Sequence, residues 1–90
     1  MTDTRDFKGV FIPNKVWKDT RLTALDKVIL VQIDTMGKDE NGYSVSNSEL
    51  ADFCHCSTTK VSTTISKLRD LGYISIEKFD GRKRKMNVSF

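Results

Sequence analysis

Apolar residues recur at helical spacing in three segments of the chain, and the first of these is "LTALDKVILVQIDTMG". Its expected inner face consists of Leu25, Val28, Ile29, Ile33 and Met36. Thr23 is placed to cap this helix, Asp26 stands where a capping box needs it, and Gly37 supplies the stop. Leu30 falls nearer the polar face, so we expect it either to lie under the N-terminal arm or to contact a partner.

Two further helices are predicted in close succession. In "SNSEL", Ser46 caps a helix of about two turns, and Glu49 reaches back to the Ser46 N–H as in a capping box. The apolar residues of this helix are Leu50, Ala51, Phe53 and Cys54. Ser57 caps the next helix, which we predict over 57–71, and Gly72 ends it. Its apolar residues are Val61, Ile65, Leu68 and Leu71.

Short alternating stretches predict two isolated strands. The first runs from Val10 to Ile12, where Pro13 stops it, and a turn of helix carrying Trp17 follows. The second is expected from Tyr43 to Val45, after the loop that begins "KDENG".

The C-terminal segment "YISIEKFDGRKRKMNVSF" predicts a β-hairpin. A two-residue turn at Asp80-Gly81 would place Ile74 opposite Asn87 and so mix apolar with polar residues on one face. A three-residue loop, Phe79-Asp80-Gly81, instead sets Ile74 opposite Met86 and restores an apolar face. We therefore predict the three-residue loop.

The order of these elements predicts an α+β fold of the winged helix-turn-helix type, with a three-helix core, a C-terminal β-hairpin wing and a short N-terminal strand. The tight turn after the second of the three helices supports this, because a turn of three or four residues between helices is typical of the motif. Residues 1–9 are expected to form a flexible arm, and residues 10–90 the domain.

Two stretches resemble known families. "LADFCHCSTTKVSTTISKLRDLGYISIE" resembles the helix-turn-helix and the start of the wing in bacterial winged-helix proteins. "FIPNKVW" and "RLTALDKVIL" are similar to helix-turn-helix domains at the N-termini of phage and plasmid replication initiators. The resemblance covers about residues 10–90 and implies DNA binding. His55 stands where these families commonly have a turn glycine, and histidine tolerates a left-handed backbone better than most residues.

Composition agrees with one small domain of 90 residues, 38% of them hydrophobic. The start "MTDTRDFKG" lacks the apolar core of a signal peptide, so a cytoplasmic location is expected. Charge is uneven: residues 1–59 hold seven Lys/Arg against nine Asp/Glu, whereas residues 60–90 hold eight against three. The basic C-terminal third indicates either a polyanionic partner, most often nucleic acid, or a solvated surface.

Short hydroxyl side chains occupy the face of helix 57–71 opposite its apolar stripe. We expect this face to read base edges in the major groove, through Thr58, Thr59, Ser62, Thr63 and Ser66. The alternative is that these residues only cover a solvated helix. The binding interpretation is favoured because "STTKVSTTIS" has low helix propensity, a cost that a binding face would explain.

Basic residues on the same helix and on the hairpin are expected to contact the DNA backbone or its minor groove. With the cap of that helix, the predicted set is Ser57, Lys60, Lys67, Lys78, Arg82, Lys83, Arg84 and Lys85. On a hairpin alone, such a run could instead serve solubility or protect an exposed strand edge.

The triplet Cys54-His55-Cys56 contains every cysteine and histidine of the chain. A zinc site needs about four ligands, and redox pairs are usually spaced C-x-x-C, so neither a metal site nor a redox site is predicted. Cys54 and Cys56 are expected to act as small core hydrophobes and His55 to make the bend. No catalytic constellation or phosphate-binding loop is visible, so we expect neither an enzyme nor a cofactor.

Two functions follow from these patterns. The leading one is a sequence-preferring double-stranded DNA-binding protein that serves phage or plasmid replication, plasmid transfer or transcriptional regulation. Such a protein is expected to act as a dimer or on repeated sites. The alternative is a winged-helix adaptor for protein–protein assembly in a replisome or relaxosome, with Trp17 and Leu30 as its contacts. An end at Phe90, where the wing closes, suits a complete protein or a domain of a longer initiator.

Overall fold

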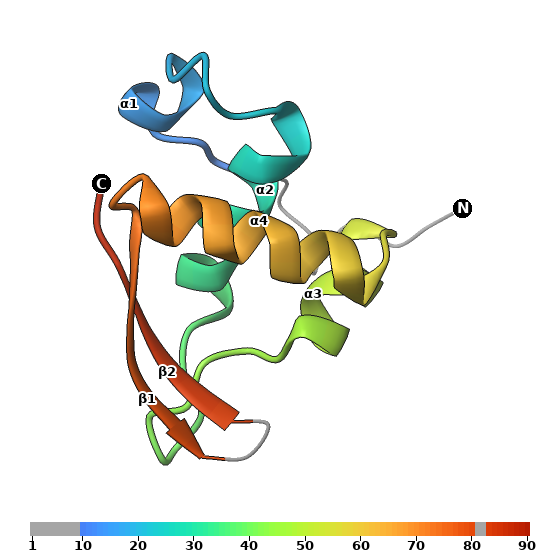
Figure 1. Cartoon of the computed structure of the whole chain (residues 1–90), viewed down its shortest axis with the longest axis vertical. Coiled ribbons are helices and arrows are strands. Elements are labelled where there is room, and N and C mark those ends of the chain that lie inside the picture. Colours follow the sequence, from blue (N-terminus) through green and yellow to red (C-terminus); the bar gives the residue numbers. More distant parts are fainter. Residues whose placement is uncertain (1–9, 81–82) are drawn as a thin grey trace.

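Four helices precede a C-terminal antiparallel hairpin in the computed structural model of the chain, which describes residues 10–80 and 83–90 (Figure 1). The elements are α1 Asn14–Trp17, α2 Ala24–Met36, α3 Asn47–Cys54, α4 Thr58–Asp70, β1 Ile74–Asp80 and β2 Lys83–Val88. The fold is therefore α+β, with a two-stranded sheet. In Figure 1, α4 crosses the middle of the molecule and the hairpin leaves its C-terminal end.

The helix starts follow from their caps. The predicted capping box of α2 is confirmed: the Thr23 hydroxyl accepts from the Asp26 N–H at 3.1 Å, and the Asp26 carboxylate accepts from the Thr23 N–H at 3.0 Å. Ser46 and Ser57 cap α3 and α4 as predicted. The Glu49 carboxylate differs, because it accepts from the Ser46 hydroxyl at 3.2 Å where we predicted a bond from the Ser46 N–H.

The turn between α3 and α4 depends on His55, which is left-handed as predicted, with φ 54° and ψ 45°. This conformation brings the N–H groups of His55 and Cys56 onto the carbonyl oxygen of Ala51. Ala51 itself is buried between the helices, where a small side chain permits their close approach. The three residues 55–57 therefore suffice to join α3 to α4.

The two isolated strands are not formed. Val10 to Ile12 have no strand structure: the one sheet of the described residues is β1 with β2, and this segment pairs with neither strand. Val10 instead lines a hollow together with Leu25 and Phe53 on the helices. In the segment from Tyr43 to Val45, Ser44 makes only a single bridge with Lys38. The Ser44 N–H donates to the Arg84 carbonyl at 2.8 Å, so this segment does lie along β2.

The hairpin keeps the expected apolar face but reaches it differently. Asp80 pairs with Lys83, so the predicted loop Phe79-Asp80-Gly81 is wrong: Phe79 and Asp80 are paired in β1. Only Gly81 and Arg82 stand between the strands, and both lie outside the described residues.

The change of register comes from a bulge inside β1 instead. Ile76 pairs with Met86 and Lys78 with Lys85, which leaves Glu77 as the extra residue. Ile74 consequently lies opposite Val88 and not opposite Met86. An odd offset was needed to keep the apolar residues on one face, and the bulge supplies it while leaving the turn short.

The core is centred on α2, against which α3, α4 and β2 all pack. Leu30 is 0% exposed and belongs to this core, so the expectation of a partner contact is wrong. The helix is covered on more than one face, which periodicity alone did not indicate. Met36, assigned to the inner face, is 41% exposed because it stands in the last turn of the helix. Cys54 and Cys56 are partly buried against the core, in line with their prediction as small hydrophobes.

No helix in the described part of the chain is both long and apolar enough to cross a membrane.

Replacing His55 by glycine is expected to raise the free energy of unfolding by about 0.5–1 kcal/mol, because glycine adopts a positive φ without a Cβ penalty. Urea denaturation followed by circular dichroism measures this. His55→Val, which puts a β-branched side chain at the same φ, is expected to lower the stability. A glycine variant less stable than the natural chain would contradict the strain assigned to this turn.

Candidate nucleic-acid interface

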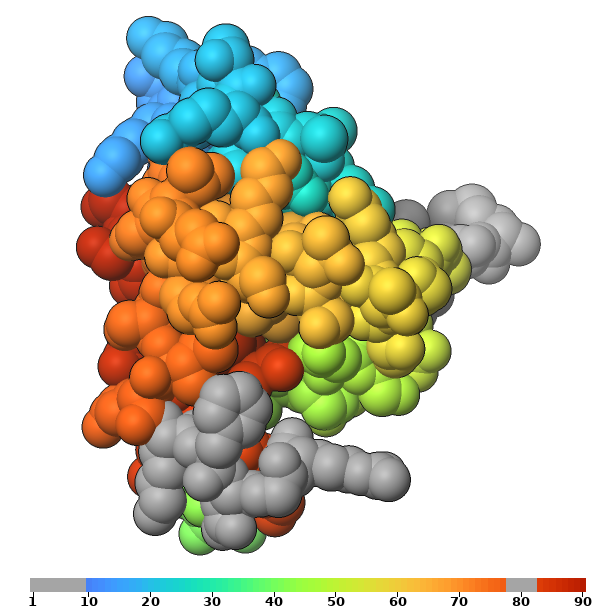
Figure 2. All heavy atoms as spheres, in the orientation of Figure 1, coloured from blue at the N-terminus to red at the C-terminus, as the bar shows by residue number. Residues whose placement is uncertain are grey.

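One side of helix α4 packs against the rest of the protein, and the other side is exposed to solvent. Its buried residues are Val61, Thr64, Ile65 and Leu68, and it packs on α2, α3 and β1. All five predicted base-reading residues are exposed: Thr58, Thr59, Ser62, Thr63 and Ser66. Figure 2 shows α4, in gold to orange, lying across the near face with no other segment over it. The fold thus brings the predicted hydroxyl residues together on one accessible surface.

The hydroxyl groups of Thr63 and of the N-cap Ser57 already make hydrogen bonds to the backbone of α4. The Thr63 hydroxyl donates to the Thr59 carbonyl oxygen at 3.0 Å, which engages its proton but leaves its oxygen able to accept. The Ser57 hydroxyl accepts from the Lys60 N–H at 3.0 Å as the cap of α4. That bond does not use the Ser57 proton, so a bond from this hydroxyl to a phosphate oxygen remains chemically possible.

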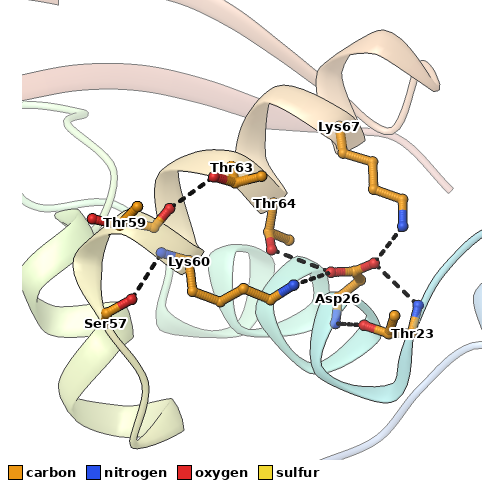
Figure 3. Close-up of polar contacts among 8 residues, drawn as sticks. All are labelled: Thr23, Asp26, Ser57, Thr59, Lys60, Thr63, Thr64 and Lys67. Atoms are coloured by element: carbon orange, nitrogen blue, oxygen red, sulfur yellow. Dashed lines mark hydrogen bonds and ion pairs between the residues drawn. The ribbon is translucent and has the colours of Figure 1, made fainter.

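Lys60 and Lys67, both predicted to contact phosphates, point toward α2 and meet Asp26 (Figure 3). The Lys67 Nζ lies 2.7 Å from Asp26 Oδ2, and the Lys60 Nζ lies 3.8 Å from Asp26 Oδ1. The side chains of Lys67 and Lys60 remain 39% and 41% exposed, whereas that of Asp26 is 1% exposed. The two lysines therefore lie at the edge of the α2–α4 contact.

Asp26 stays ionised despite its burial. Burial alone would raise its pKa, but the bond from Lys67, the Thr23 N–H, the Lys67 charge and the Thr64 hydroxyl together hold the pKa below its usual range. The position of Asp26 in the sequence indicated only a helix cap. Its second role, as the buried partner of α4, involves residues about forty positions away and has no local signal.

Arg84 lies on the core-facing side of β2. Its Nη2 donates to the side-chain oxygen of Asn47, the first residue of α3, and so ties the hairpin to that helix. Burial lowers the pKa of its guanidinium. The Arg84 Nε is the one buried side-chain nitrogen without a hydrogen-bond partner among the described residues. Arg84 is thus partly withdrawn from the basic run to which the sequence assigned it.

Lys83 and Lys85 lie on the opposite side of β2 from Arg84, as alternation in a strand requires. Their Nζ atoms are 5.5 Å and 5.3 Å from the centre of the Tyr43 ring, within the range of cation–π attraction. Sequence reasoning did not include Tyr43 in the site, because only the fold carries residues 38–45 to the edge of β2. The ring of Tyr43 and the ammonium groups of Lys83 and Lys85 therefore lie together beside β2.

Lys78 and Arg82 are the other two predicted backbone contacts on the hairpin. Lys78 stands opposite Lys85 in the hairpin register. Arg82 lies outside the described residues.

No group of three or more His, Cys, Asp or Glu side chains within residues 10–80 and 83–90 is arranged to hold a metal ion. Cys54 and Cys56 are free thiols. Burial, with a contribution from Cys56, raises the pKa of Cys54, so its thiol is less readily ionised than a free cysteine.

Replacing Asp26 by asparagine is expected to lower the free energy of unfolding by about 1–3 kcal/mol at neutral pH, since the buried negative charge and one of its two acceptor oxygens are lost. Because folding lowers the pKa of Asp26, its stabilising effect is complete above its ordinary pKa of about 4 and disappears as the pH falls through the folded value. Denaturation curves of both proteins from pH 7 to pH 2 measure this.

The difference in the free energy of unfolding between the natural protein and Asp26→Asn should therefore become smaller at acid pH. The matched control is Asp34→Asn, which removes a carboxylate from an exposed position of the same helix and is expected to change stability by less than about 0.5 kcal/mol. If the stability difference caused by Asp26→Asn does not vary with pH, an ionised carboxylate at this position is contradicted.

Comparisons of the chain with protein-family models, with curated proteins and with solved structures found no match.

Proposed function

We propose that this chain is a sequence-preferring double-stranded DNA-binding domain of the winged helix-turn-helix type. Helix α4, within the predicted recognition segment 57–71, would enter the major groove, and the hairpin would be the wing. The observation that carries this proposal is the exposed row of five short hydroxyl side chains on a helix whose other faces are buried or tied to α2. Such side chains can approach base edges closely, and the threonine methyl groups can contact thymine methyl groups.

The order of elements supports the same function. A short left-handed turn joins α3 to α4, as in helix-turn-helix proteins, and a basic hairpin follows directly. The exposed face of α4 consists mainly of residues with low helix propensity, which is unfavourable for stability and which a binding role would explain.

Phosphate binding would fall mainly to Lys83 and Lys85 among the described cations, with Ser57 and the N-terminal amides of α4 adding contacts. One recognition helix covers few base pairs, so two copies or repeated sites are expected. The resemblance to initiator domains makes phage or plasmid replication the first setting to test, with plasmid transfer and transcriptional regulation as the others.

The alternative, a protein–protein adaptor, keeps only Trp17 of its two candidate contacts, since Leu30 is buried. Trp17 is 60% exposed, with the Lys27 Nζ 4.7 Å from its ring centre, and Phe11 is 85% exposed. These aromatic side chains could meet a protein partner. An adaptor would bind duplex DNA weakly even at low salt, so one titration distinguishes the two functions.

The affinity for a random-sequence duplex is expected to fall steeply as the salt concentration rises. The double variant Lys83→Gln/Lys85→Gln is expected to reduce the slope of log K against log salt by about 1.8, because each phosphate that is no longer neutralised removes about 0.9 from the slope. Fluorescence anisotropy between low and moderate salt measures this. The matched control is Lys15→Gln/Lys18→Gln, which removes the same amount of charge from α1 and its C-terminal cap. Figure 1 shows α1 at the opposite end of the molecule from the start of β2, where Lys83 and Lys85 lie. Equal slopes for all three proteins would exclude the hairpin lysines from the interface.

Thr59→Ala and Thr63→Ala are expected to reduce the ratio of target to random-duplex affinity by about fivefold or more each, comparable to one mismatched base pair. The target comes from selection of bound sequences out of random duplexes, in which a palindrome would indicate a dimer and direct repeats an array. Glu40→Ala, at an exposed position outside α4, is the control. Alanine variants that weaken target and random binding equally would show that these threonines do not read bases.

A further inference from the structure

Helix α4 carries three parallel stripes of side chains, each displaced by one residue from the next. Residues 61, 65 and 68 are buried in the core. Residues 60, 64 and 67 meet Asp26, and residues 59, 63 and 66 are exposed. Because one residue corresponds to a rotation of about 100°, the stripe that meets Asp26 lies between the core and the proposed DNA face.

The contacts of Asp26 are directional. Its Oδ2 accepts from the Lys67 Nζ at 2.7 Å and from the Thr23 N–H at 3.0 Å, and its Oδ1 accepts from the Thr64 hydroxyl at 3.2 Å (Figure 3). An apolar stripe tolerates some sliding and rolling of one helix on another. Hydrogen bonds to a buried carboxylate do not, because each has a preferred distance and angle. Asp26 therefore restricts the rotation of α4 about its own axis.

We propose that Asp26 is a positioning residue for the DNA interface: it sets the rotation of α4 and therefore the direction in which Thr59, Thr63 and Ser66 point. Asp26 also keeps Lys67 as its counter-ion within the protein. This rests on the proposed function. The role of Lys67 then differs from the one its charge and place in the sequence predicted, because this lysine does not contact phosphate when the protein binds DNA.

The reason is the burial of Asp26. If Lys67 moved to a phosphate, a carboxylate that is 1% exposed would be deprived of its closest cation, and an uncompensated buried charge is strongly unfavourable. Lys60 lies 3.8 Å from the same carboxylate, beyond hydrogen-bond distance, and cannot replace Lys67 without moving. Lys83 and Lys85 instead face the Tyr43 ring, which holds a cation less strongly than a buried carboxylate does.

The first test compares Lys67→Gln with Lys83→Gln in the salt dependence of random-duplex binding. Lys83→Gln is expected to reduce the slope of log K against log salt by about 0.9, whereas Lys67→Gln leaves the slope unchanged. A reduction of about 0.9 for Lys67→Gln as well would overturn the counter-ion role. Should Lys67→Gln fail to fold, amine modification of the natural protein decides: Lys67 is expected to react equally with and without DNA, and protection of Lys67 by DNA would overturn the role.

The second test measures how well the protein discriminates its target from random duplex DNA. Asp26→Asn is expected to reduce the ratio of target to random-duplex affinity by about fivefold to tenfold, comparable to one mismatched base pair, without reducing the salt slope. Thr64→Val, which keeps the shape of the side chain but removes its bond to Asp26, is expected to act in the same direction with a smaller effect, and it is used if Asp26→Asn does not fold. Folded variants that keep the natural ratio would overturn the positioning role.

The two proposals fail in different ways. If the natural protein shows no salt-dependent duplex binding, the proposed function is wrong and the positioning role falls with it. If the natural protein binds and discriminates, but Lys67→Gln behaves like Lys83→Gln or the Asp26 and Thr64 variants keep the natural ratio, then only the role of Asp26 is wrong.

Discussion

Asp26, near the start of α2, is the one buried acidic residue among the described residues, and α4 packs over it. Asp26 caps its own helix through Thr23, and it also accepts bonds from Thr64 and Lys67 on α4. One side chain thus connects the start of one helix to the middle of another. Because the cations that compensate this charge come from α4, the burial of Asp26 is favourable only when α4 is packed on α2.

Basic residues that are neighbours in the sequence have separate surroundings in the fold. Alternation along β2 sends Arg84 to Asn47 on the core side and leaves Lys83 and Lys85 beside Tyr43. Together with the engagement of Lys60 and Lys67 by Asp26, this means that the charge count of the C-terminal third overstates the charge free to meet a polyanion. Surface potential depends on where each charge is held, which the number of lysines and arginines does not reveal.

The hairpin shows how a correct constraint can be satisfied in more than one way. The apolar residues of the two strands can share a face only if one extra residue is inserted between them. Turn chemistry at Asp80-Gly81 suggested the loop as the place, but the extra residue is Glu77, inside β1. A bulge within the strand keeps Ile76 opposite Met86 while the strands continue to pair as far as Asp80 and Lys83.

Local patterns were enough to predict the features that short-range bonds set: the caps at Thr23, Ser46 and Ser57, the extent of the helices, and the left-handed turn at His55. These depend on partners within about four residues, which a local pattern contains. Local patterns did not reveal the burial of Leu30, the missing strand at 10–12, the partner of Arg84 or the direction of Lys60 and Lys67. Each of these depends on packing between distant segments. Lys67 and Asp26 are 41 positions apart, and only the packing of α4 on α2 brings them together.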